Sequence, residues 1–154
     1  MTVLDIFHQF QDAGIGHALR TSNHLVGAAL QLFHITGFTL LLASILVISL
    51  RLLGGGLKHQ PASEITRSAF PLFWIGLFLA VTSGTLIFLS GAVHYYGNEY
   101  FWLKLVLLLL AVVVQLVLFR IVDDRTPFAT RLAGFLSLIL WFGVGIAGRT
   151  IGFV

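Results

Sequence analysis

Residues 24–51 read HLVGAALQLFHITGFTLLLASILVISLR, with no Asp, Glu, Lys or Arg between Leu25 and Leu50. At about 1.5 Å per residue, a helix of this length crosses a hydrocarbon core about 30 Å thick with some tilt. His34 lies near its middle, and an ionisable side chain inside a membrane span indicates a functional site. We therefore predict a transmembrane helix that carries a functional histidine.

The composition indicates an integral membrane protein. The 154 residues are 58% hydrophobic and 10% charged, whereas soluble domains are about a quarter charged. The net charge of +3 comes from basic residues scattered at helix ends, so we expect no nucleic-acid partner. The chain has no cysteine, which excludes thiolate-bound iron–sulfur clusters and covalently attached c-type haem.

The rest of the chain has room for three more spans and short connections. We expect a single all-α domain over residues 1–154, a transmembrane four-helix bundle. A short amphipathic helical segment over residues 2–20, broken at Gly14 and Gly16, should precede it and lie in the membrane interface. Pro71 is expected in the first turns of the second span, where a missing N–H is tolerated. The four spans are predicted at about 23–52, 68–95, 99–122 and 131–153.

Basic residues near the loops predict the orientation. The first and third connections carry three each and the second carries one: Arg51, Lys58 and Arg67; Arg120, Arg125 and Arg131; and Lys104. Because cytoplasmic loops are enriched in Lys and Arg, both termini should face outward. We expect the inner membrane of a bacterium, with the termini in the periplasm and the lipid bilayer as the surroundings.

Each predicted span carries one stripe of small or polar residues on an otherwise apolar surface, judged at 100° per residue. Helix contacts in lipid favour small residues, so the stripes should face the interior of the bundle. They are His24, Gly27, Gln31 and His34; Gly76, Ala80, Ser83, Ile87, Gly91 and His94; Lys104, Leu108, Ala111 and Gln115; and Gly134, Ser137, Trp141, Gly145 and Gly148, with Arg149 beside the last.

Basic and imidazole groups gather in the outer half of this predicted bundle, which favours a b-type haem. Haem iron takes one or two axial ligands, usually His, and its propionates bind cations. We expect His34 to be one axial ligand, with His94 or Lys104 opposite it and His24 as a weaker candidate. Arg149 or Lys104 would then bind the propionates.

Gln31, one turn from His34, is the residue that we expect to orient the imidazole. The resulting function hypothesis is electron transfer near the outer face, within a larger membrane assembly or homo-oligomer.

Other interpretations of these residues stay open. His34 could be a core histidine that hydrogen-bonds Ser83 or Thr85, or it could bind a metal ion such as copper. His24 and His94 could be interfacial side chains, and Arg149 could extend to the membrane surface. No nucleophile–base pair, phosphate loop or carboxylate dyad is visible, so the sequence assigns no enzymatic reaction. The competing functions are a cofactor-free accessory subunit and a transporter of a metal or small ligand.

Several motifs resemble a family of small bacterial four-helix membrane proteins of unknown function. They are His34-Ile35-Thr36-Gly37, Leu50-Arg51-Leu52-Leu53-Gly54, TSGTLIF (82–88), NEYFWLKL (98–105) and LWFGVGIAGRTIGF (140–153).

The chain is more distantly similar to the copper-resistance D membrane proteins and to the four-helix, haem-binding protoporphyrinogen oxidases. In these oxidases a first-span His and a third-span Lys serve haem and activity, which implies such roles for His34 and Lys104 alone. The Trp-x-Gly-Gly pattern that follows their histidine is missing here. The resemblance therefore implies haem binding rather than porphyrinogen oxidation.

Overall fold

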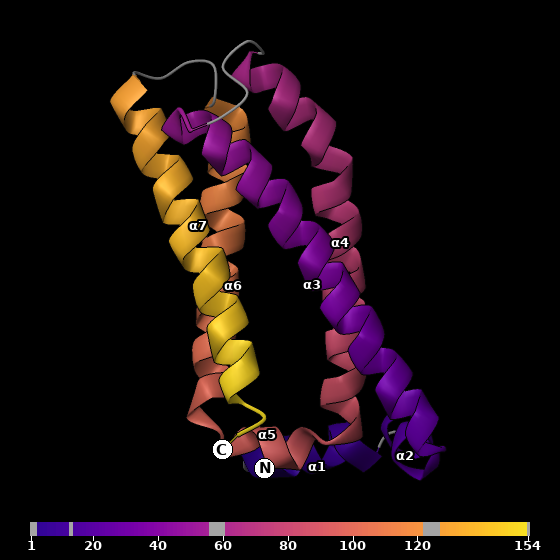
Figure 1. Ribbon diagram of the computed structural model, residues 1–154. Coiled ribbons are helices and arrows are strands. Elements are labelled where there is room, and N and C mark those ends of the chain that lie inside the picture. Colours follow the sequence, from indigo (N-terminus) through magenta and orange to yellow (C-terminus); the bar gives the residue numbers. More distant parts are fainter. Residues whose placement is uncertain (1–2, 13, 56–60, 122–126, 154) are drawn as a thin grey trace.

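The protein is all-α, as a computed structural model shows for residues 3–12, 14–55, 61–121 and 127–153 (Figure 1). The helices are α1 (Val3–Asp12), α2 (Gly14–Thr21), α3 (His24–Leu53), α4 (Ala62–Ser90), α5 (Ala92–Tyr96), α6 (Glu99–Ile121) and α7 (Pro127–Thr150). The four long helices α3, α4, α6 and α7 form a bundle, and each is long and apolar enough to cross a membrane. The predicted fold class is confirmed, and the chain is a multi-pass membrane protein.

Both chain termini lie at one end of the bundle, here called the termini end (Figure 1). The short helices α1, α2 and α5 lie across this end, and the opposite end is called the far end. Helix α3 packs against α4, α6 packs against α7, and the two pairs meet mainly through α3 and α7. Lys58 and Arg125, which contribute to the predicted orientation, lie outside the described residues.

The closest helix contact is the crossing of α3 and α4 at two glycines. A Cβ on Gly76 would lie 2.5 Å from the backbone N of Leu41 and 2.7 Å from the carbonyl O of Gly37. A Cβ on Gly37 would lie 2.7 Å from the backbone N of Ala80. The two backbones are therefore in direct contact, as small residues permit in membrane helices. This crossing fixes how the following turns of α3 and α4 face each other.

The predicted stripe of α3 is wrong over its first two turns. His24, Gly27 and Gln31 are exposed, and a Cβ on Gly27 would meet nothing within 4 Å. The oblique crossing carries this end of α3 past α4 and away from α6 and α7 (Figure 1). The buried face of α3 begins later and consists of Gly37, Leu41, Ser44, Ile45, Ile48, Ser49 and Leu52.

The stripes of the other three spans are confirmed where the helices pack. The buried members are Gly76, Ala80 and Ser83 on α4, Ala111 and Gln115 on α6, and Gly134, Ser137 and Trp141 on α7. Small residues allow the close approach in each case, and Gln115 and Ser137 satisfy each other's polar groups in part.

Helix α4 differs from the predicted second span at both ends. It begins at Ala62, because the segment 63–67 continues the helix with Glu64 in the first turn, where an acidic group favours the helix dipole. Pro71 therefore lies inside the helix rather than in its first turns. The helix ends at Ser90, and the break at Gly91 separates it from α5.

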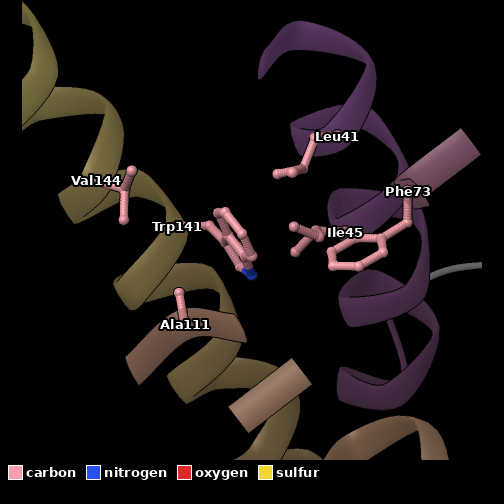
Figure 2. Packing of buried hydrophobic residues seen from close by; sticks show 6 residues of the cluster. All are labelled: Leu41, Ile45, Phe73, Ala111, Trp141 and Val144. Atoms are coloured by element: carbon pink, nitrogen blue, oxygen red, sulfur yellow. The ribbon is translucent and has the colours of Figure 1, made fainter. Parts of the chain in front are cut away.

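The main apolar core lies between the helix pairs in the middle of the bundle (Figure 2). Trp141 of α7 is fully buried, and its ring centroid lies 5.9 Å from that of Phe73 on α4, edge to face. Such pairs add to the stabilisation that comes from apolar burial. The cluster consists of Leu41, Ile45, Phe73, Ala111, Trp141 and Val144.

A polar pair continues this core toward the far end. The hydroxyl of Ser137 donates a hydrogen bond of 2.6 Å to Oε1 of Gln115, and both side chains are 0% exposed. Nε2 of Gln115 and Nε1 of Trp141 have no partner among the described atoms. The pair therefore joins α6 to α7 but leaves one amide donor unpaired.

Substituting Ser137 by alanine should lower the free energy of unfolding by about 1–3 kcal/mol, because Oε1 of Gln115 would then also be buried without a partner. The double variant Ser137→Ala/Gln115→Leu should recover most of this loss, since it removes both polar groups. Thermal unfolding in detergent, followed by circular dichroism, measures both. Equal losses in the single and double variants would contradict the role of this hydrogen bond.

At the termini end, α1 packs through one apolar residue, as an amphipathic helix should. Phe7 is 8% exposed, and its ring contacts the rings of Phe88, Tyr96 and Trp102. The backbone N–H of Val93 donates to Oε1 of Gln11 in α1 at 3.1 Å. The N-terminal segment thus covers this end of the bundle as two short helices, α1 and α2.

Candidate functional site

His34 is positioned by the crossing of α3 and α4. It lies one turn before Gly37, so its ring faces the turn of α4 that follows Ala80. Its Nδ1 lies 2.8 Å from the carbonyl O of Ala80 and 3.3 Å from Oγ of Ser83. Because the carbonyl can only accept, Nδ1 carries the hydrogen and donates it. In the neutral ring, the lone pair is then on Nε2.

Lys104 reaches the other nitrogen of this ring from α6. Its Nζ donates to Nε2 of His34 at 3.4 Å. The sequence predicted both residues as candidates, and the structure brings them together across the two helix pairs. Each side chain is only partly exposed.

Two glycines provide the space for this pair. A Cβ on Gly84 would lie 2.9 Å from Cε1 and 3.2 Å from Nδ1 of His34. A Cβ on Gly148 would lie 3.3 Å from both Cε and Nζ of Lys104. Helical periodicity predicts Gly148 on the interior stripe of its span but does not identify Gly84. A glycine within an apolar span, directly after Ser83, is the signal that could have identified it.

The interior of the bundle is closed toward its middle and more open toward the termini end. Leu41, Ala111 and Trp141 are 0% exposed. The interior positions nearer the termini end are all partly exposed: His34, Gly84, Lys104, Gly145 and Gly148. The His34–Lys104 pair therefore lies in the partly exposed part of the interior, with a fully buried apolar core beyond it.

The remaining candidates lie apart from this pair. His94 is exposed on α5, beside the ring of Tyr95, because the break at Gly91 takes it off the face of α4. His24 is exposed in the first turn of α3. Neither has a described contact with His34, so the structure does not place them as opposing ligands.

Gln31 differs from expectation, whereas Arg149 agrees with the alternative of a side chain that extends to the membrane surface. Gln31 is exposed, and the hydrogen bond expected from it is made instead by the carbonyl of Ala80 and the hydroxyl of Ser83. Arg149 is exposed, with its guanidinium carbon 4.6 Å from the ring centroid of Phe153.

The alternative of a hydrogen-bonded core histidine is partly confirmed. Ser83, one of the two expected partners, lies 3.3 Å from Nδ1 of His34. The other, Thr85, is exposed and donates its hydroxyl to Val81 within its own helix. Among the described residues, no group of three or more His, Asp or Glu side chains could hold a metal ion.

The pair brings together two nitrogen atoms, each of which can bind a metal when it carries no proton. The imidazole is fixed in orientation and tautomer, whereas the amine sits on a flexible stem. Such a pair can bind a metal centre from both sides, or it can share a proton across the contact. A metal–imidazole bond is about 2.0–2.1 Å long, so two donors on opposite sides of one metal lie about 4 Å apart. The observed 3.4 Å is close to that separation.

The chain belongs to a family of unknown function, DUF6644, whose model matches residues 7–154. No curated protein and no solved structure matches the chain. The resemblance to a family of unknown function is thus confirmed. The more distant similarity to copper-resistance D proteins and protoporphyrinogen oxidases has no support in these comparisons.

Proposed function

We propose that this member of the DUF6644 family is a membrane protein that binds haem b and transfers electrons, with His34 as an axial ligand. The observation that carries the proposal is the hydrogen bond from Nδ1 to the carbonyl of Ala80. Histidines that ligate a metal almost always donate their other ring N–H to a carbonyl, a carboxylate or water, which fixes the tautomer and raises ligand basicity. Here that bond leaves Nε2 facing Lys104 on α6.

Lys104 is the group that we assign to the opposite side. Its Nζ lies 3.4 Å from Nε2 of His34, so these two residues would hold the haem iron if haem binds here. The lack of a side chain at Gly148 is what allows Lys104 to pack against α7 at this level. When bound, haem supplies reversible one-electron chemistry, whose potential depends on burial and axial ligands. The sealed core around Trp141 would exclude water from the side of the site that faces the membrane centre.

We further propose a location in a bacterial inner membrane, with both termini in the periplasm. This orientation rests on the basic residues near the loops and on the positive-inside rule. The site would then lie near the periplasmic face, since His34 is in the first half of α3 and Lys104 is in the second turn of α6, and both helices begin at the termini end (Figure 1). A redox partner in a larger assembly, or in a homo-oligomer, would complete the electron transfer.

One observation favours a second candidate, the cofactor-free accessory subunit. Nε2 of His34 and Nζ of Lys104 already satisfy each other at 3.4 Å, so the pair needs no ligand to be stable. Transport of a metal or small ligand stays a prediction that no contact of the described residues favours.

The absorbance of the purified protein tests the proposal. Protein from haem-replete cells should show a Soret band and close to one haem per chain in a pyridine haemochrome assay. His34→Ala should lose the band, because the oriented axial nitrogen is gone. His94→Ala is the matched control and should keep it, since His94 lies outside the site. Colourless but monodisperse wild-type protein would overturn the proposal and favour the accessory subunit.

A further inference from the structure

A groove of about 360 Å³ lies between α3 and α7, on the surface of the bundle. Two residues of α3 and five of α7 line it: Phe38, Leu42, Phe142, Gly145, Ile146, Arg149 and Thr150. Its lining is apolar apart from the last two residues. In a membrane-spanning bundle such a groove faces lipid rather than water.

The polar and apolar parts of the groove are separated by depth. Arg149 and Thr150 are in the last turn of α7, at the termini end. Phe142 is seven residues earlier, so it lies about 10 Å nearer the membrane centre. On α3, Leu42 is likewise one turn deeper than Phe38. The groove therefore runs from a cation at headgroup depth into an apolar channel.

We propose that this groove binds an anionic phospholipid of the leaflet at the termini end, with the phosphate on Arg149 and one acyl chain in the channel. Among the described contacts, the guanidinium meets the ring of Phe153 and no carboxylate. A phosphate can supply the missing anion through charge-assisted hydrogen bonds, which the planar guanidinium favours.

The deep part of the groove decides between a lipid tail and a polar ring such as a quinone. A quinone head would need a hydrogen-bond donor near its carbonyls, and Phe142, Leu42 and Ile146 offer none. The hydroxyl of Thr150 already donates to the carbonyl of Ile146 at 2.9 Å. An acyl chain needs only apolar contact, which this lining provides. The inference does not depend on the proposed haem.

Spin-labelled phospholipids in reconstituted vesicles test this proposal. The fraction of motionally restricted label should be greater for phosphatidylglycerol than for phosphatidylcholine with the same acyl chains. One basic side chain near an anionic headgroup contributes about 1 kcal/mol, which corresponds to an affinity ratio of about fivefold. Arg149→Gln should reduce that ratio to about one. Arg120→Gln, which removes an exposed arginine at the far end, should leave it unchanged.

A second variant tests the channel itself. Ile146→Trp fills the groove from an exposed position and should release both lipids alike, without affecting the core. Equal retention of the two lipids by the wild type, or equal effects of Arg149→Gln and Arg120→Gln, would overturn the proposal. Displacement of the labelled phosphatidylglycerol by micromolar decylubiquinone would also overturn it, because the groove would then be a quinone-binding site.

Discussion

Replacing Gly76 by leucine should prevent α3 and α4 from docking and leave no stable bundle. A Cβ at this position would lie 2.5 Å from the backbone N of Leu41 and 2.7 Å from the carbonyl O of Gly37. These are backbone atoms of a facing helix, so no rotamer change can relieve the overlap. Overpacking typically costs about 1–3 kcal/mol where side chains can shift, and we expect at least the upper end of that range here.

Gly27→Leu is the matched control. It introduces the same side chain into α3, the helix whose Gly37 faces Gly76. A Cβ on Gly27 would meet nothing within 4 Å, and leucine is a better helix former than glycine. Fluorescence-detected size exclusion and thermal unfolding in detergent should show aggregation of Gly76→Leu and an unchanged or raised midpoint for Gly27→Leu. Similar behaviour of the two variants would contradict the crossing.

The sequence predicted the parts of the fold that follow from local patterns. Four apolar spans follow from length and composition alone. The interior positions Ala80, Ala111 and Trp141 follow from the rule that small residues and the rare polar ones face other helices. Those predictions hold because lipid leaves few other reasons for Gly, Ser or Gln in an otherwise Leu-rich and Val-rich span.

The interior face of α3 could not be predicted in the same way. Helical periodicity groups His24, Gln31 and His34 on one face, but it does not say over which turns that face meets another helix. That depends on the crossing at Gly37 and Gly76, which involves two helices and an angle. Once the crossing is known, the exposure of His24 and Gln31 follows directly.

The side chains of the candidate site could be predicted from the sequence, but the backbone carbonyl that orients His34 could not. His34 and Lys104 could be paired from their depth and their stripes. The carbonyl of Ala80 could not be identified, because the residue type says nothing about a backbone acceptor and helical carbonyls are normally used within the helix. The displacement of His94 depends on the break at Gly91, which the sequence analysis treated as part of a continuous span.

The crossing of α3 and α4 therefore also determines the position of His34 in the candidate site. Gly37 and Gly76 bring the backbones into contact, and the preceding turn of α3 then places the imidazole of His34 against the carbonyl of Ala80. Gly84, two turns after Gly76, provides the space for that ring. A side chain at position 84 should therefore displace the ring of His34 and leave the helix packing largely unchanged.

If the protein binds haem as proposed, Gly84→Val should abolish that binding while the bundle stays folded. The new Cβ would lie 2.9 Å from Cε1 and 3.2 Å from Nδ1 of His34, so the ring must turn away and lose its bond to Ala80. The overlap is with a side chain that can move, so we expect a loss in stability of no more than about 1–3 kcal/mol. Haem content by pyridine haemochrome, set against the midpoint of thermal unfolding, separates the two effects.

Gly143→Val is the matched control, since a Cβ there would meet only Cδ1 of Leu107 at an ordinary 3.5 Å. It should keep the haem of the wild type. Modification of His34 by diethyl pyrocarbonate, mapped by mass spectrometry, gives a readout that does not need haem. A ring released from Ala80 and Lys104 has its nitrogens free, so Gly84→Val should react several-fold faster than Gly143→Val. Equal rates and equal haem contents in the two variants would mean that Gly84 does not hold the imidazole in place, and that the hydrogen bond to Ala80 is not what orients Nε2.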